Sequence, residues 1–481
     1  MKIDKMNTTP AFRGPLTAAL AFLDTNATAN ATLIDLGAMV APRTYIDTKK
    51  RNKYAGAETF FREFTGTLIV CLSSGLFAMG FARAANKLID PKTNINPKSW
   101  FTDDAVSTLK KAWSKGENTK DFVSNVLNNL SGQDGAAISK LKNTKEISEK
   151  FTKYIDWNFG RKEAKLTAKE IEDQITNDLR VNRSVNVNID GAKLNTSVEN
   201  LIRDMRDMGK DIFNNKNINI ENAFKKIAKV NKIKTLGALG IASVLGLTNQ
   251  YINRKITEKR TGKTGFVGEV GYNSKNNKSG KDTSLKFKAE KGLVSAGIAA
   301  LALAVMRVKN PKDFIKKLEF AGPVTSGNAI KTVYTATLIG RFLASDNKQE
   351  LGETAFRDYF GFLNWLVLGG FAAKGAANLM DPHKKELFNI HKEGKGVKHW
   401  LNDISVKSHK EAAAKGIPMW KINTAHIAGL AYSTLMLGVV LTRLNVYFSR
   451  RKYKKEQEAA VQPARAMTFT ALPKAFKEFA K

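Results

Sequence analysis

The chain has a single cysteine, Cys71, among 481 residues, which excludes a disulfide framework and a cysteine-rich zinc site. Its five histidines never lie three or four residues apart, so no helix carries the HExxH spacing of zinc hydrolases. The nucleophile motif GxSxG and a GxGxxG loop after a strand are absent as well. We therefore expect no catalytic residue, no metal ligand and no cofactor, and the sequence predicts that the protein is not an enzyme.

Acidic residues are scarce relative to basic ones, with 44 Asp and Glu against 78 Lys and Arg, for a net charge of +34. The cations recur in nearly every polar stretch, at the edges of uncharged apolar blocks. Charge in that position is typical of the flanks of membrane helices. Anionic headgroups and nucleic acid are the usual partners of such charge, and the pattern favours the lipid bilayer over nucleic acid.

Long uncharged stretches are what the sequence does contain. Residues 64–82 and 235–253 are 19-residue stretches without charge, and 422–442 extends over 21 residues with only His426 titratable. A helix needs about 20 such residues to cross the hydrocarbon core. Two further blocks, 292–306 and 359–373, have 15 residues each and suit short or tilted helices. The sequence predicts an all-α, polytopic helical membrane bundle, located in the membrane as a multi-pass protein.

Two segments of the chain resemble each other. ETFFREFTG at 58–66 matches ETAFRDYFG at 353–361 at five of nine positions, and each copy runs into an apolar block. Each block then ends alike, with AANKLIDP from residue 84 and AANLMDP from residue 376. A third match joins 98–116 to 398–416. Three matches in one order predict two related repeat units. Whether these units are parallel or inverted depends on the number of crossings between them, and the sequence leaves it open.

The repeats divide the chain into predicted segments. A polar, mostly helical insertion interrupts the first unit, and its NVNIDGAKLN stretch at 186–195 predicts a hairpin with an Asp-Gly turn. Alternating stretches at 266–272 and 283–289 around a Gly/Asn-rich turn predict a β-hairpin or a linker between the units. The predicted segments are 10–116 (first part of unit 1), 117–230 (insertion), 231–260 (last helix of unit 1), 261–291 (hairpin or linker), 292–455 (unit 2) and 456–481 (polar tail). We expect the N-terminal apolar stretch to be retained, since it echoes residues of unit 2.

The candidate functional residues are repeated charges beside the apolar blocks. Glu58 and Arg62, and likewise Glu353 and Arg357, stand at i and i+4, the spacing at which a helical Glu–Arg pair meets. We expect these pairs at one mouth of the bundle, where they gate a path, bind a headgroup or simply anchor the helix. The candidates for the opposite mouth are Asn86, Asp90, Asn378 and Asp381.

The remaining histidines and the overall role follow from this interpretation. His383, His391, His399 and His409 fall in a polar loop, where we expect them to be solvated, and Asn423 is placed to partner His426 as a structural histidine. The sequence indicates an integral membrane protein in transport, lipid interaction or scaffolding. The alternative is a basic soluble or peripheral protein that binds nucleic acid or anionic membrane surfaces.

Overall fold

The computed structural model is mostly helical. The residues that it describes are 14–89, 101–116, 119–131, 152, 186–189, 192–208, 219–262, 267–268, 281–320, 327–390, 394, 396–451 and 454. The predicted Asp90, the 456–481 tail and most of the first predicted linker strand lie outside them.

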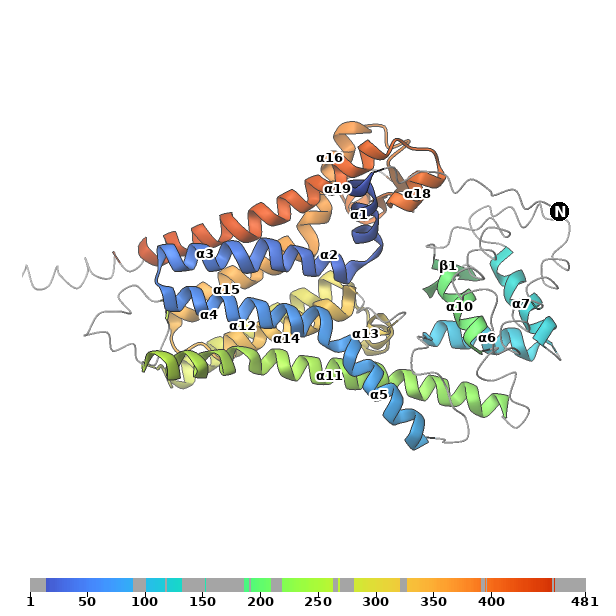
Figure 1. Ribbon diagram of the computed structural model, residues 1–481, viewed down its shortest axis with the longest axis horizontal. Helices are drawn as coiled ribbons and strands as arrows, with labels where there is room; N and C mark the ends of the chain where they lie inside the picture. The colour runs from blue at the N-terminus through green and yellow to red at the C-terminus, as the bar shows by residue number, and fades with distance from the viewer. Residues whose placement is uncertain are drawn as a thin grey trace, which may run out of the picture.

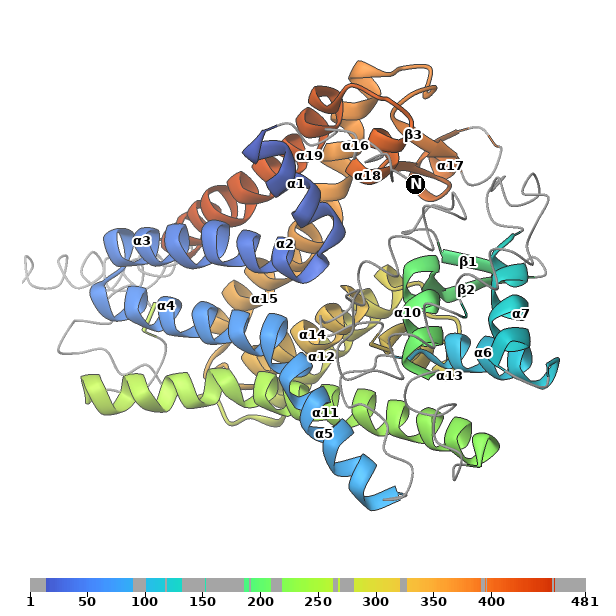
Figure 2. The ribbon, with the colours of Figure 1, turned by 45° about the vertical axis from the view of Figure 1, so that its right-hand side comes forward.

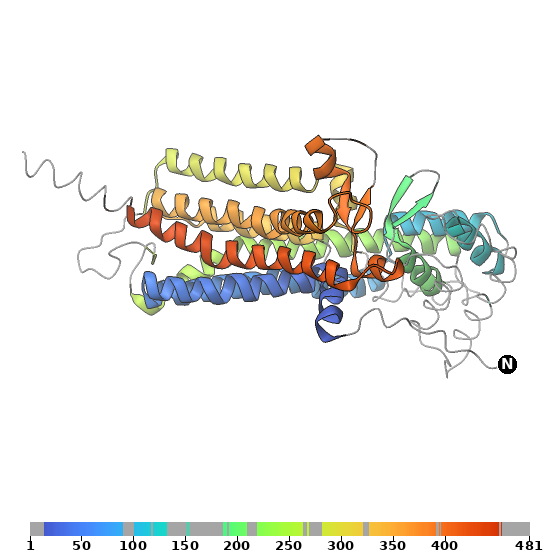
Figure 3. The same ribbon diagram turned by 90° about the horizontal axis from the view of Figure 1, so that it is seen from above.

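Long helices run side by side to form a bundle (Figures 1 and 3). Several contain a π-helical segment, named η, where the helix widens for one turn. The bundle elements are α2 (Ala27–Ile34), η1 (Asp35–Val40), α3 (Ala41–Lys50), α4 (Lys53–Thr67), η2 (Leu68–Ser73), α5 (Ser74–Ile89), α11 (Ile220–Thr261), α12 (Leu285–Val305), α14 (Gly327–Leu343), α15 (Lys348–Leu363), η5 (Asn364–Leu368), α16 (Gly369–Met380), α19 (Met419–Thr434) and η6 (Leu435–Val440).

Among the described residues, three continuous helices are long and apolar enough to cross a membrane, namely Lys53–Ile89, Ile220–Thr261 and Met419–Arg451. They contain the three uncharged stretches that the sequence analysis singled out. Only 39%, 44% and 33% of the most apolar window of each is buried inside the chain. Most of each apolar stretch therefore faces outward rather than into a protein core.

The outward faces carry large apolar side chains. Leu76 on α5 is 65% exposed, and Val244 on α11 and Leu435 on η6 are each 57% exposed. A water-soluble protein rarely leaves contiguous apolar surface of this kind uncovered. The exterior of the bundle is thus suited to a hydrocarbon environment.

Inside the bundle, small residues let α11 and α14 cross closely. A Cβ on Gly340 would lie 2.3 Å from the backbone oxygen of Leu247, and one on Gly246 would lie 2.5 Å from Thr337 Oγ1. Glycine is required at both positions, as expected where helix association depends on close packing. Around this crossing, Phe342, Phe362 and Leu338 belong to the apolar core of the bundle.

The polar insertion folds beside one end of the bundle (Figure 2). β1 (Asn186–Ile189) and β2 (Ala192–Ser197) pair antiparallel, with Ile189 opposite Ala192, which confirms the predicted hairpin. Its core also takes the first turns of α11, through Phe224 and Ile227, so one helix joins the insertion to the bundle across the predicted boundary at 230. The other elements are α7 (Thr119–Ser131), α10 (Val198–Met208) and α6 (Asp103–Ser114), which precedes the predicted start of the insertion at 117 but packs into its core through Leu109 and Ala112.

The second predicted linker strand is wrong. Residues 285–289 form the first turns of α12, which begins after the N-cap Ser284, whose side chain accepts a hydrogen bond from the Phe287 N–H at 3.2 Å. The residues that alternate between apolar and charged at 283–289 lead directly into a long apolar helix. The N-cap at Ser284 favours the helical conformation for them.

Short elements cover the end of α16 and α19, at the top of Figure 1. β3 and β4 pair antiparallel, with Phe388 opposite Val406, and enclose a small apolar cluster with Ala377 and Ile422. The short elements of the chain are α1 (Pro15–Thr25), α13 (Pro311–Leu318), β3 (Phe388–Ile390), α17 (Gly396–Asn402), β4 (Ile404–Val406) and α18 (His409–Ala414).

Candidate functional site

A cluster of buried charges lies at one end of the bundle and is centred on Glu63 of α4. Arg43 of α3 approaches Glu63 Oε1 at 3.2 Å, and Arg62 approaches the same oxygen at 3.1 Å. Arg341 of α14 bridges Glu63 at 3.0 Å and Asp358 of α15 at 3.3 Å. All these side chains are less than a tenth exposed. Ion pairs between side chains of four helices therefore take the place of solvation by water for these buried charges.

The cluster extends through further ion pairs between helices. Arg51, which follows α3, contacts Glu353 of α15 at 2.7 Å. Arg254 of α11 contacts Asp346 at 2.9 Å and also pairs with Glu350. A buried charge is tolerated only when it is paired and hydrogen-bonded, so these contacts hold α3, α4, α11, α14 and α15 in one register. We call the charges described in this and the preceding paragraph the axial charge cluster.

The four predicted helix-mouth residues come together in this cluster, although with different partners. Glu58, Arg62, Glu353 and Arg357 all line one small cavity of about 30 Å³. Arg62 pairs with Glu63 and Arg357 with Asp358 at 3.0 Å, while Glu58 accepts a hydrogen bond from Gln250 at 3.0 Å. The predicted i, i+4 pairing within each helix does not form, because carboxylates on neighbouring residues and helices satisfy the guanidinium groups.

The candidates for the opposite mouth have separate structural roles. The Asn86 backbone oxygen accepts a hydrogen bond from Lys226 at 3.1 Å. Asp381, which follows α16, accepts hydrogen bonds from the backbone N–H groups of residues 385, 386 and 387 and so closes a turn. Asn378 is half-buried on α16.

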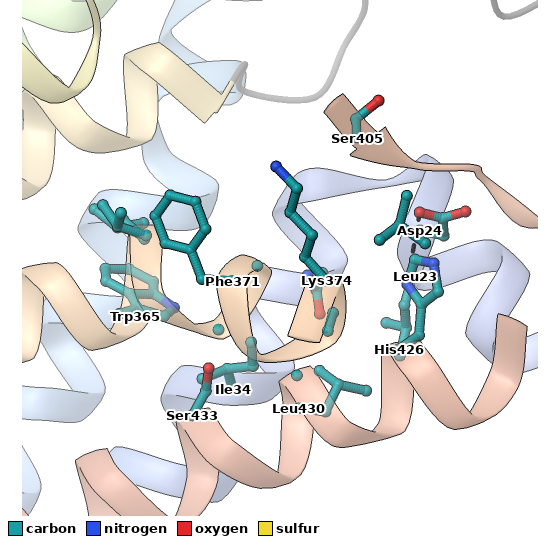
Figure 4. Close-up of a pocket in the computed structure, with 18 of the residues that line it drawn as sticks. Leu23, Asp24, Ile34, Trp365, Phe371, Lys374, Ser405, His426, Leu430 and Ser433 are labelled. Atoms are coloured by element: carbon teal, nitrogen blue, oxygen red, sulfur yellow. Dashed lines mark ion pairs between the residues drawn. The ribbon is translucent and has the colours of Figure 1, made fainter. Parts of the chain in front are cut away.

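A much larger cavity, of about 580 Å³, lies further along the bundle between α1, η5, α16 and α19. Figure 4 shows Trp365 and Phe371 on one side of it and Asp24 with His426 on the other, with Lys374 between them. Lys331 and Lys374 are the basic groups among its lining residues. This size and mixed lining are typical of sites that hold small organic molecules.

Asp24, His409 and His426 form a compact group beside this cavity. Asp24 Oδ2 lies 3.2 Å from His409 Nδ1, and Asp24 Oδ1 lies 3.8 Å from His426 Nδ1. Ligand atoms of the three residues all lie within 4.8 Å of one another, close enough to hold a metal ion. No spacing signal could have found this group, because Asp24 and His409 are 385 residues apart.

Two expectations about the histidines are wrong. His409 is fully buried rather than solvated, because the short elements at 381–416 fold onto α1 and α19. Asn423 partners His409 Nε2 at 3.1 Å, not His426. His399, by contrast, lies 3.3 Å from Asp403 in a pair of its own, away from the cavity lining.

The charge cluster and the large cavity occupy different depths of the same bundle. On α15 and its continuation, Asp358 precedes the cavity residue Trp365 by seven positions, or about 10 Å of helix. One end of the bundle is thus closed by ion pairs, and beyond it lies space for a ligand. No protein-family model, curated protein or solved structure matches the chain.

Proposed function

We propose that the protein is a multi-pass membrane transporter, in which the large cavity holds the solute and the axial charge cluster is the closed gate at one side. The observation that carries the proposal is the inverted distribution of side chains. Apolar residues such as Leu76 and Val244 face outward, while Glu63, Arg341 and Asp358 are buried inside. Ionisable groups inside a membrane bundle commonly mark the path of a solute or an ion.

The internal duplication supports the proposal. Glu63 and Asp358 are equivalent by the sequence match, as are Gly66 and Gly361. A Cβ on Gly66 would lie 3.6 Å from Arg341 Nη2, and one on Gly361 would lie 3.7 Å from Arg43 Nη2. Each unit therefore places an arginine against the equivalent glycine of the other. Transporters built from paired repeats place their sites at such an interface.

The π-helical segments support the same two-unit arrangement. η2 (Leu68–Ser73) and η5 (Asn364–Leu368) occupy equivalent positions at the sequence offset of 295 that relates Glu58 to Glu353. A π-helical turn offers backbone carbonyls that lack ordinary helical partners and often occurs at functional sites. η5 contributes Trp365, Leu366 and Val367 to the large cavity.

The cavity lining supports an anionic organic molecule as the solute. Trp365 and Phe371 supply flat apolar contacts, and Lys331 and Lys374 supply positive charge. Lys374 Nζ lies 4.5 Å from the centre of the Trp400 ring and donates to the Trp400 backbone oxygen. A carboxylate or phosphate group on the solute would compensate these cations.

The gate is tested by chemical labelling from each side of the membrane. In a Cys71→Ala background, Leu430→Cys places one thiol in the cavity wall, and a charged, membrane-impermeant thiol reagent is added to vesicles of each orientation. We expect labelling from one side only. In the Arg357→Gln/Asp358→Asn variant, which removes the ion pairs of Asp358 with Arg357 and Arg341 and leaves Arg341 paired with Glu63, we expect labelling from both sides.

Glu258→Gln is the matched control, because Glu258 pairs with the exposed Lys255 outside the cluster. It should keep the one-sided pattern. A gate variant that inserts normally but is still labelled from one side only would contradict the gate. Release of the whole chain from membranes by carbonate would contradict the membrane arrangement itself and favour the basic, peripheral alternative.

A further inference from the structure

We propose that Asp24, His409 and His426 bind a divalent transition-metal ion of the zinc class, with a coordination position that faces the large cavity. The three residues come from α1, α18 and α19; α1 lies far in the sequence from the two consecutive helices α18 and α19, and the three meet beside the cavity (Figures 1 and 4). Two imidazoles and one carboxylate form a donor set that zinc and similar metals prefer over calcium or magnesium.

The distances fit such an ion. A tetrahedral zinc site with bonds near 2.0–2.1 Å has ligand atoms about 3.3 Å apart. The Asp24 oxygens lie 3.2 Å from His409 Nδ1 and 3.8 Å from His426 Nδ1. These two distances involve different Asp24 oxygens, and the ligand atoms of all three residues lie within 4.8 Å of one another, so coordination requires the side chains to move closer together.

Hydrogen bonds around His409 direct its Nδ1 lone pair toward the proposed ion. His409 Nε2 faces Asn423 Oδ1 at 3.1 Å, and the Asn423 amide group donates to Thr17 Oγ1 at 2.9 Å. The oxygen of Asn423 therefore accepts a hydrogen bond from the Nε2–H group, which leaves Nδ1 facing a carboxylate oxygen. Either a proton on Nδ1 or a metal ion can lie between these two atoms, and metal-bound histidines are commonly oriented by an acceptor in this way.

His426 provides an independent observation. Its Nε2 is buried and makes no hydrogen bond of ordinary geometry within the described part of the chain, although the Lys407 backbone lies near enough to interact with the imidazole. An unpaired buried nitrogen is costly unless it serves another purpose, such as metal binding. Rotation of this imidazole toward Asp24 offers either nitrogen as a ligand.

The position of Asp24, His409 and His426 would place the metal ion within reach of a molecule in the large cavity. Asp24 and His426 both line the large cavity, so an ion between them borders the space where the proposed solute lies. Three protein ligands leave one position of a tetrahedral ion open. A carboxylate or phosphate in the cavity can occupy it.

The test uses the full-length chain in detergent micelles, with any affinity tag removed and bound metal stripped by a chelator. Zn²⁺ is titrated in competition with a coloured chelator, and Co²⁺ is titrated separately for its visible absorption. We expect one tight site per chain and a tetrahedral Co²⁺ spectrum. His426→Gln and Asp24→Asn should each weaken Zn²⁺ binding at least about 100-fold, and Asn423→Leu should weaken it about 10–100-fold.

His399→Gln is the control, because its pair with Asp403 lies outside the group. It should bind Zn²⁺ like the unmodified chain. Size-exclusion elution and circular dichroism identify any variant that fails to fold. Absence of a stoichiometric site in the unmodified chain, or an equal loss in His399→Gln, would overturn the proposal and leave His409 and Asp24 as a protonated ion pair. Because the readout is metal binding, it stands apart from the outcome of the gate experiment.

Discussion

The bundle and the small insertion domain differ in the side chains that they expose and in the number of charges that they bury. The insertion core contains Leu201, Ile202 and Met205, which are fully buried, and its charged groups, such as Lys225 and Glu221, are largely exposed. The bundle instead buries Glu63, Arg341 and Asp358 and exposes Leu76 and Val244. Both regions bury apolar side chains, but the bundle adds a cluster of buried ion pairs and an apolar exterior, which is the pattern that we attribute to a lipid environment.

The largest expected effect comes from breaking the axial charge cluster. Glu63→Leu removes the carboxylate shared by Arg43, Arg62 and Arg341 and leaves buried guanidinium groups with too few partners. We expect the free energy of unfolding in micelles to fall by about 3–5 kcal/mol. In the insertion domain, Glu221→Gln removes an exposed partner of Lys110 and should cost less than about 1 kcal/mol. A similar loss of unfolding free energy in the two variants would contradict the difference that we describe between the bundle and the insertion domain.

A second prediction concerns the outer face of α11. Val244 is 57% exposed in the middle of an uncharged stretch, so Val244→Arg places a charge on the surface that we assign to lipid. On scales of membrane insertion, a central arginine costs about 2.5–3.5 kcal/mol. We expect a matching loss of inserted protein, measured by carbonate extraction after expression. On a face exposed to water, the same substitution would change stability by less than about 0.5 kcal/mol. An effect that small would contradict our assignment of this face of α11 to lipid.

The sequence predicted the helices and the hairpin of each region better than the contacts between side chains. Uncharged length identified the three apolar helices, and the Asp-Gly signal located the hairpin at 186–197, because both patterns are local. The expected Glu58–Arg62 pair failed because a better partner for Arg62 lies next to it at Glu63. The spacing of residues along a helix shows which charged groups can form a pair. Competing partners nearby determine which of these pairs form.

Contacts over long sequence separations were beyond prediction. Arg341 and Glu63 are 278 residues apart, and Asp24 and His409 are 385 apart, so no periodicity relates them. The four residues that the repeat singled out, Glu58, Arg62, Glu353 and Arg357, nevertheless line one small cavity. The histidine group had no such signal, because its members come from three different elements and are not repeated.

A third prediction uses the pKa of Asp204 in the insertion domain. Burial raises this pKa to about 7, although the neighbouring Arg203 lowers it in part. An unfolded aspartate ionises near pH 4, so the contribution of Asp204 to folding is complete below about pH 4 and is lost as the pH rises through about 7. Between pH 5 and pH 8 we expect the domain to lose on the order of 2 kcal/mol of stability.

Hydrogen exchange of the β1, β2 and α10 amides in the full-length chain measures this change, after correction for the intrinsic effect of pH. Asp204→Asn should remove most of the dependence, whereas Glu221→Gln, at an exposed site, should leave it unchanged. A steep loss of protection that persists in Asp204→Asn would assign the effect to another group.

The smallest expected effects come from helix caps, and they should be alike in the two regions. Thr102 caps α6 of the insertion through a hydrogen bond from the Ala105 N–H at 3.1 Å, and Ser284 caps α12 of the bundle in the same way. Each N-terminus leaves unpaired N–H groups that the cap satisfies, so replacement by alanine should cost about 1 kcal/mol in either case. Because the Ser284 end of α12 is exposed, the cap works there as it does in water. Unfolding of Thr102→Ala and Ser284→Ala in micelles measures both, and a cost at Ser284 several times larger would place that helix end within the apolar layer.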